Sequence, residues 1–269
     1  MLSAHSISSK LALEFSRRSN GKTVLSRRRT GGLAHVGKSY WNGNVLLTQV
    51  VNPTAGFFAG DDISFQIKVR EGANVLLSQP GATRIHTMDS NKKASINQRF
   101  EVSHDASLDL YPDLSISQRE SSLIQKTELH LASSAKCCYL EIIAPGRVAH
   151  GEALEWNLLS NYTDIYLEGA LLVRERMHLG PDDKWRLMTR QGKPLYVATF
   201  WIRHLDVAQW RERFLFDSLV KGSFTILDEG FACLRLASES SVKIRNAVSN
   251  IREQLHLYDP LFGNSNALY

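Results

Sequence analysis

The chain has 269 residues, of which 43% are hydrophobic, so it is long enough to bury one large core. No apolar run approaches the roughly 18 residues that a membrane-spanning helix needs, and three cysteines are too few for a disulfide framework. These limits predict a single domain over residues 1–269, without a membrane partner, in a reducing compartment such as the cytoplasm.

The net charge of +5 is concentrated at the N-terminus. Residues 1–40 hold eight Lys or Arg against one acid, Glu14, and therefore carry +7, whereas the rest of the chain carries −2. A nucleic-acid or acidic-partner patch and an organelle transit peptide are both compatible with this composition. However, Leu11–Phe15 alternates like a strand, and Arg27–Arg29 lack interleaved aromatic residues. We therefore expect a solvated basic rim and no nucleic-acid partner.

The first half of the chain alternates between apolar and polar residues, which is the period of a β-strand. Residues 11–15 and 23–25 flank an Asn-Gly turn and predict a hairpin. Residues 43–51 form a buried strand in this interpretation. Residues 63–69 and 74–79 alternate on either side of Glu71-Gly72, and we predict a second hairpin there.

Strands of this kind, each closed by Gly, Pro, Asn or Asp, recur to about residue 200 without a helical segment between them. This pattern predicts a mainly β fold of stacked sheets rather than alternating strands and helices. We find no repeat of fixed period. Toward the C-terminus, residues 207–219 and 241–255 have the composition or spacing of helices, and residues 223–236 predict a last hairpin.

Acidic residues and hydroxyls gather at the ends of the predicted strands, beside glycine or proline turns. They are Asp61, Asp62, Thr83, Asp109, Asp113 and Glu152. If these strand ends converge, the side chains would line an internal polar passage and would need water, a cation or a partner. Considered one at a time, Asp61 and Asp62 are turn caps on statistical grounds. His150 beside Glu152 could bind a divalent cation, although such pairs are more often solvated.

The adjacent cysteines, Cys137 and Cys138, offer no metal site. Successive side chains of a strand point to opposite faces, so the two thiols cannot bind one ion without distortion. We expect both to fill core positions. The chain also lacks a nucleophile elbow, zinc-ligand spacing and a dinucleotide fingerprint, so we expect no catalytic residues and no tightly bound cofactor or metal.

Four motifs resemble the urease accessory proteins of the UreD (or UreH) family, in family order and at family-like spacing. Residues 55–61 (AGFFAGD) resemble G-G-L-V-G-G-D, and residues 78–84 (SQPGATR) resemble T-T-P-G-A-T-K. Residues 108–113 (LDLYPD) are similar to L-E-W-L-P-Q, and residues 145–152 (PGRVAHGE) to L-G-R-x-A-x-G-E. The chain is identified as a divergent member, since several positions depart from these patterns.

The resemblance implies stacked mixed β-sheets in a superhelical, β-helix-like arrangement with a few helices toward the C-terminus. It implies a non-catalytic scaffold that binds a UreF-type partner, and through it a UreG-type GTPase, and docks on apo-urease. Nickel would be in transit through an internal polar tunnel. The motif positions expected near that tunnel are Asp61, Ser78, Thr83 and Glu152, with Asp62, Asp109, Asp113 and His150 as second-tier candidates.

Two glycines of the first motif are alanines here, Ala55 and Ala59. Alanine at a positive φ is strained, so either these positions are not left-handed or the loop has a different geometry. Two other functions stay open at this point. One is an all-β hydrolase or lyase that uses Asp61, Asp62 and Glu152 as acid and base. The other is an interaction module that has lost the nickel role.

Overall fold

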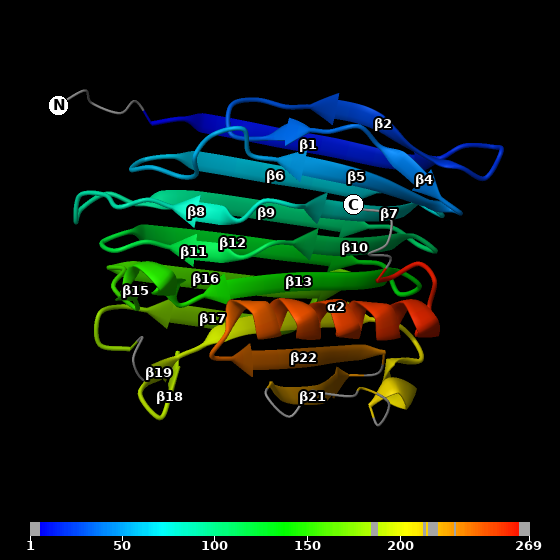
Figure 1. The fold of residues 1–269 in the computed structure, drawn as a ribbon. Coiled ribbons are helices and arrows are strands. Elements are labelled where there is room, and N and C mark those ends of the chain that lie inside the picture. The colour runs from blue at the N-terminus through cyan, green and yellow to red at the C-terminus, as the bar shows by residue number, and fades with distance from the viewer. Residues whose placement is uncertain (1–5, 184–187, 212–213, 215–219, 229, 264–269) are drawn as a thin grey trace.

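The computed structural model describes residues 6–183, 188–211, 214, 220–228 and 230–263. Within them the chain forms a β-solenoid of about four turns, with two large stacked sheets and one α-helix near the C-terminus. Figure 1 shows the strands as successive layers from β2 at the top to β21 at the bottom. The mainly β, β-helix-like fold expected from the sequence is therefore confirmed.

The first sheet has seven strands and contains a parallel central part. Its order is β17 (Ala170–Leu179), β16 (Leu158–Leu167), β12 (Ser122–Leu131), β9 (Ala94–Val102), β6 (Asp62–Val69), β1 (Ser8–Arg17) and β2 (Thr23–Arg29). Strands β1, β6, β9, β12 and β16 run parallel, whereas β2 and β17 at the two ends are antiparallel to their neighbours. The predicted hairpin of β1 and β2 is confirmed.

The second sheet has eleven strands, of which eight follow one path. Its order is β21 (Lys221–Asp228), β22 (Phe231–Ser238), β20 (Tyr196–Arg203), β13 (Lys136–Ala144), β10 (Ser107–Pro112), β7 (Asn74–Gln79), β5 (Val45–Val51) and β3 (His35–Val36). Beside this path lie β4 (Tyr40–Asn42), β8 (Thr83–Ile85) and β11 (Ser115–Ser117). Two small sheets join β14 (Gly146–Arg147) to β15 (Glu152–Ala153), and β18 (Thr189–Arg190) to β19 (Lys193–Pro194).

The turn at Glu71-Gly72 joins the two sheets, so the predicted hairpin of residues 63–69 and 74–79 is wrong. Strand β6 pairs with β1 and β9 in one sheet, and β7 pairs with β5 and β10 in the other. The turn is an arch whose next copies along the chain are residues 103–106 and 132–135. Backbone hydrogen bonds continue through the stacked arches, for example from Gly72 N to His104 O at 3.2 Å.

Each arch has the same short sequence pattern, which explains why the turns stack. A strand of the first sheet ends on Val or Leu, three residues form the turn, and an alanine then precedes the next strand in the second sheet. The three alanines, Ala73, Ala106 and Ala135, are all buried under the arch. The strands that begin the successive turns start at Asp62, Ala94, Ser122 and Leu158, so the turns differ in length. A search for a fixed period therefore finds no repeat.

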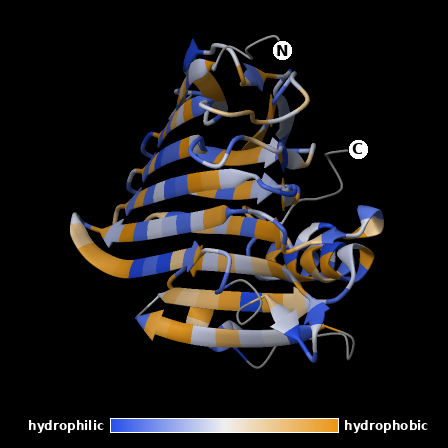
Figure 2. Ribbon diagram, turned by 90° about the vertical axis from the view of Figure 1, so that its left-hand side faces the viewer, coloured by the Kyte–Doolittle hydropathy of each residue, from blue (hydrophilic) through white to orange (hydrophobic). Residues whose placement is uncertain are grey.

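Alternation along the strands separates two cores. The larger cluster fills the space between the sheets, and the second lies on the outer face of the eleven-stranded sheet beneath α2 (Ser241–Tyr258). Figure 2 shows the hydrophilic and hydrophobic bands that alternate along the strands, with α2 on one side of the molecule. Cys137 belongs to the first core and Cys138 to the second, as expected for adjacent strand residues.

The C-terminal elements agree only partly with the predictions. Helix α2 begins after Ser240, whose hydroxyl accepts a hydrogen bond from Lys243 N, and it extends three residues beyond the predicted end. The hairpin of β21 and β22 is confirmed. Of the helix predicted at 207–219, the structure describes a 3₁₀ helix at Val207–Trp210, and most of the remainder lies outside the described residues. None of the described helices is long and apolar enough to cross a membrane.

Candidate functional site

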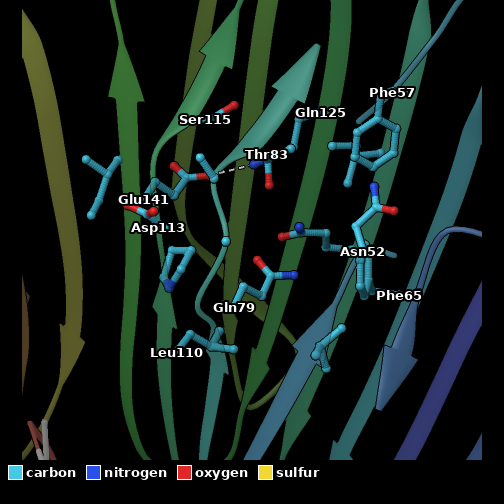
Figure 3. Close-up of a pocket in the computed structure, with 18 of the residues that line it drawn as sticks. Asn52, Phe57, Phe65, Gln79, Thr83, Leu110, Asp113, Ser115, Gln125 and Glu141 are labelled. Carbon is cyan, nitrogen blue, oxygen red and sulfur yellow. Dashed lines mark hydrogen bonds between the residues drawn. The ribbon is translucent and has the colours of Figure 1, made fainter. Parts of the chain in front are cut away.

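A cavity of about 470 Å³ lies between the two sheets. Its opening lies at the ends of three neighbouring strands, β5 at Val51, β7 at Gln79 and β10 at Pro112. These strands end at the same height in three successive layers, and loops follow them. The loops after β5 and β7 are exposed and form its rim, and both belong to the glycine-rich motifs of the sequence. Figure 3 shows side chains from these different layers around one space.

Most of the cavity wall is apolar, but its inner part carries a connected set of polar side chains. Glu141 on β13 is at the centre of this set. Its Oε1 accepts hydrogen bonds from Tyr139 Oη at 2.6 Å and Gln125 Nε2 at 2.8 Å, and its Oε2 accepts one from Asn161 Nδ2 at 2.9 Å. Tyr139 Oη also contacts Gln98 Oε1 at 3.3 Å. The donors to this carboxylate are neutral, so its charge is solvated by dipoles and not by a cation.

The surroundings of Glu141 make its carboxyl easier to protonate than an ordinary glutamate. Burial raises the pKa of Glu141 above its ordinary value, and the negative charge of Glu175 raises it further. The hydrogen bonds from Tyr139, Asn161 and Gln125 oppose this shift in pKa without cancelling it. A carboxyl group with a raised pKa and no resident cation can bind a positive charge that enters the cavity.

Polar residues continue from Glu141 toward the last layer of the solenoid. On β13, β20 and β22 the register aligns Glu141, Thr199 and Arg235. In the facing sheet, Thr163 on β16 is aligned with Glu175 on β17. Arg235 Nη2 donates to Glu175 Oε2, and both side chains are partly exposed at this end. The interior therefore carries polar side chains from the cavity to a second, ion-paired position near the surface.

Only two of the eight residues predicted from the motifs line the cavity. Thr83 lies on its wall at the start of β8. Asp113 lies there too, and its carboxylate pairs with Arg245 of α2 at 2.9 Å. Asp61 is buried near the N-terminal strand, where its carboxylate accepts hydrogen bonds from Ile7 N at 2.8 Å and Phe58 N at 2.7 Å. The interpretation of Asp61 as a turn cap thus describes its contacts.

Ser78 and Asp109 point to the outer face of the eleven-stranded sheet and away from the cavity. Asp109 is fully buried and forms two hydrogen bonds with the guanidinium of Arg252, at 2.9 and 2.8 Å. Gly263 N donates to the same carboxylate at 2.8 Å. Ser78 is 2% exposed, and its hydroxyl has no hydrogen-bond partner among the described residues. Asp109 therefore helps to hold the C-terminal elements on the sheet.

The remaining predicted residues lie on separate surfaces. Glu152 forms an ion pair with Arg147, which lowers the pKa of Glu152, and His150 is exposed at the end of a 3₁₀ helix. Asp62 accepts hydrogen bonds from Ser95 and Asn97. The carboxylates of a hydrolase or lyase site would have to share one cavity. Asp61, Asp62 and Glu152 do not, and the described residues contain no group of three or more His, Cys, Asp or Glu that could hold a metal.

Comparison with known proteins decides the family. The family model described as UreD urease accessory protein matches residues 8–268. The chain belongs to the UreD family. It is 39% identical over 169 residues to a urease accessory protein UreD of Opitutus terrae, which covers 62% of each chain. A UreD protein of Halalkalibacterium halodurans is 29% identical over 252 residues, or 90% of this chain and 91% of that protein.

Within the UreD family pattern, the two alanines of the first motif fit without strain. Ala55 and Ala59 are not among the described non-glycine residues with positive φ, so left-handed backbone is not required at either position. The glycines that remain do need it: Gly56 has a φ of 147° and Gly60 a φ of 83°. A Cβ on Gly56 would also collide with the carbonyl oxygen of Arg84, which holds the two motifs together.

The motifs do not include the central residues of this UreD cavity, such as Glu141 and Gln125. These residues lie inside strands and not at strand ends. The relevant signal is a polar residue in the inward phase of an apolar strand. Glu141 follows Cys137 and Tyr139 at inward positions, and Gln125 and Thr127 stand between Leu123 and Leu129 in the same phase. Alternation alone assigns such residues to the core, where a polar group needs either partners or a function.

Proposed function

We propose that this UreD-family chain is a non-catalytic scaffold in urease maturation. In this proposal it binds a UreF-type partner, recruits a UreG-type GTPase through that partner, and assists the delivery of Ni²⁺ into apo-urease. Membership of the UreD family supports a role in urease maturation. The observation that supports ion passage is the set of polar side chains around Glu141, which extends in register from an open cavity toward the ion pair of Glu175 and Arg235.

The chemistry of this interior suits a cation in transit. Carboxylate, amide and hydroxyl oxygens can replace part of the hydration shell of a divalent ion, but they hold Ni²⁺ less tightly than a closed set of imidazoles or thiolates would. Passage requires binding that is favourable enough to enter and weak enough to leave. Glu141 supplies the one charged oxygen pair at the inner end of the cavity, and Gln125 and Asn161 supply neutral amides beside it.

The raised pKa of Glu141 gives the transfer a direct route for charge compensation. Where the carboxyl holds a proton, a cation that arrives displaces that proton into the open cavity and binds the carboxylate. When the cation leaves, the proton returns. The carboxylate then compensates one of the two positive charges of Ni²⁺, which lowers the cost of placing the ion in this environment.

The test is a Glu141→Gln variant, expressed together with the partner proteins and urease. The substitution keeps the size and shape of the side chain but removes its charge and replaces one acceptor oxygen with a donor NH2 group. We expect the maturation complex to form as in the wild type, while the nickel content and activity of the urease fall by at least about tenfold, as for loss of a close charge contact.

The matched control is Glu152→Gln, which removes a carboxylate that lies outside the cavity and is paired with Arg147. Nickel loading that falls equally in both variants would contradict a path through the interior. Full nickel loading with Glu141→Gln, in an intact complex, would favour an interaction module without a nickel role. Failure of the wild-type chain to bind a UreF-type partner would instead contradict the scaffold function itself.

A further inference from the structure

The N-terminal end of the solenoid carries an exposed strand edge. Strand β2 is the last strand of the seven-stranded sheet, and no described strand pairs with its outer side. Its second half, Ser26–Arg29, is exposed to solvent. Figure 1 shows β2 at the top of the molecule with β4 close to its first half. We call this surface, made of β2 and β4, the β2 edge.

The β2 edge holds arginines that form no ion pair within the described part of the chain, although Arg27 lies opposite Glu14 on β1. Glu14 is the single acid among residues 1–40, and Arg70 already binds it at 3.0 Å. Arg27, Arg28 and Arg29 form no ion pair with any described residue. The other end of the same sheet is built differently, because there Arg174 and Arg176 both pair with Asp164. Among the residues that the structure describes, the arginines at one end of the sheet are therefore ion-paired, whereas Arg27–Arg29 at the other end are not.

Two aromatic side chains are held in place beside these cations. Tyr40 and Trp41 on β4 are 53% and 52% exposed. Trp41 Nε1 donates to Thr23 O at 2.7 Å, which fixes the ring against the start of β2. Lys22 lies over the Trp41 ring and Lys38 over the Tyr40 ring. Trp, Tyr and Arg are the residues that most often dominate binding at protein interfaces, especially when they are held in position before the partner arrives.

We propose that the β2 edge binds an extended acidic segment of a partner protein, which adds to the seven-stranded sheet as an eighth strand beside β2. The free backbone groups of β2 would bind the segment, and acidic side chains of the segment would reach Arg27–Arg29. The aromatic rings would receive its apolar residues. This inference does not depend on the nickel role.

Two other occupants fit the surface less well. A nucleic acid would satisfy the arginines, but its backbone cannot pair with the row of N–H and C=O groups along a strand edge. A second copy of the chain would bring another +7 segment against the first, and like charges directly opposite each other are destabilising. The acidic polypeptide satisfies both the charge and the strand edge, so it is the occupant that we infer.

The probe is a labelled ten-residue peptide of alternating glutamate and threonine, with the alternating glutamine and threonine peptide as its neutral counterpart. We expect the full-length chain to bind the acidic peptide about tenfold or more tightly than the neutral one at low salt, with affinity that falls as salt rises. Hydrogen exchange should slow at the backbone amides of residues 24–29 when the acidic peptide is bound.

The variant Arg27→Gln/Arg28→Gln/Arg29→Gln should weaken acidic-peptide binding about tenfold, because it removes the arginines on whichever face of β2 the glutamates reach, together with the local positive charge. Its control, Lys126→Gln/Lys221→Gln/Lys243→Gln, removes the same charge from exposed positions elsewhere. Equal loss in both triple variants would overturn the proposal, because net charge alone would then explain binding. Unchanged exchange at residues 24–29, tighter binding of single-stranded DNA, or a dimer that protects these amides without peptide would each overturn it as well.

Discussion

Two acidic residues on neighbouring strands of the same sheet have opposite kinds of hydrogen-bond partner, one charged and the other neutral. Asp109 on β10 points outward under α2 and is bound by the guanidinium of Arg252 and by Gly263 N. Glu141 on β13 points inward and receives hydrogen bonds from a tyrosine and two amides. The first carboxylate is neutralised by a resident cation, whereas the second has neutral donors and faces a cavity.

The difference separates a structural ion pair from a site that can accept a cation. A buried carboxylate with a resident guanidinium has its charge satisfied, so it holds α2 and the chain after it against the sheet. A partly buried carboxylate with neutral donors keeps the capacity to bind a positive charge, at the cost of a raised pKa. The two faces of one sheet thus serve stability on the outside and, in our proposal, ion passage on the inside.

The largest effect should come from Arg252→Ala, which removes the cation from Asp109. Arg252 is fully buried and also lies 3.9 Å from the centre of the Tyr111 ring. Removing it leaves a buried, unpaired carboxylate, so we expect the free energy of unfolding to fall by about 3–5 kcal/mol. Urea denaturation followed by circular dichroism measures the change.

The control for this prediction lies on the same helix. Arg245 pairs with Asp113 at the surface, and Arg245→Ala should cost only about 0–1 kcal/mol. In addition, the double variant Asp109→Leu/Arg252→Met should recover much of the loss, because apolar residues of similar volume often replace a buried ion pair without penalty. Equal losses for Arg252→Ala and Arg245→Ala would remove the distinction between the two pairs.

A smaller effect is expected from Gly263→Ala, at the backbone contact that completes the Asp109 site. Gly263 has a φ of 69°, and a Cβ there would collide with the carbonyl group of Arg252. We expect a loss of about 1–3 kcal/mol in unfolding free energy. Gly192 has a similar φ of 77° but open space around it, so Gly192→Ala should cost only about 1 kcal/mol. Comparison of the melting temperatures of the two variants separates the effect of the collision from that of backbone strain. Equal decreases would contradict a collision with Arg252 at Gly263.

Much of the fold follows from the sequence, because alternation and turn residues act locally. Most strands up to β13, helix α2 and the hairpin at either end could be predicted in this way. The arches could not, because Glu71-Gly72 satisfies the rules of a hairpin, and only the repeated buried alanine at Ala73 and Ala106 shows that the chain crosses to another sheet. Whether a turn joins two strands of one sheet or crosses to another sheet depends on the strands that pair on either side. Those strands are distant in sequence, so the turn residues alone do not decide it.

The candidate site is harder to predict for the same reason. The motifs locate the rim of the cavity through the loops around Gly56 and Gly81, and at Gly56 the backbone geometry requires glycine. They do not identify Glu141, which is one polar residue in an apolar strand and has no local pattern around it. Its partners Gln125 and Asn161 come from two other layers, so their convergence is a property of the stacked fold.

The smallest effect concerns the pH dependence that distinguishes Glu141 from a paired carboxylate. The pKa of Glu141 is raised above its ordinary value of 4.5, so the folded chain binds this proton more tightly than the unfolded chain. The stabilisation is complete below pH 4.5 and is lost as pH rises through the folded-state pKa. Relative to Glu141→Gln, the wild type should therefore lose stability as pH rises. Relative to Glu152→Gln, the wild type should instead lose stability as pH falls below 4.5. The reason is that the hydrogen bond from Arg147 lowers the pKa of Glu152 in the folded chain. Urea denaturation across this pH range measures both slopes, and parallel curves for the two variants would contradict the assignment of Glu141 as a carboxyl without a resident cation.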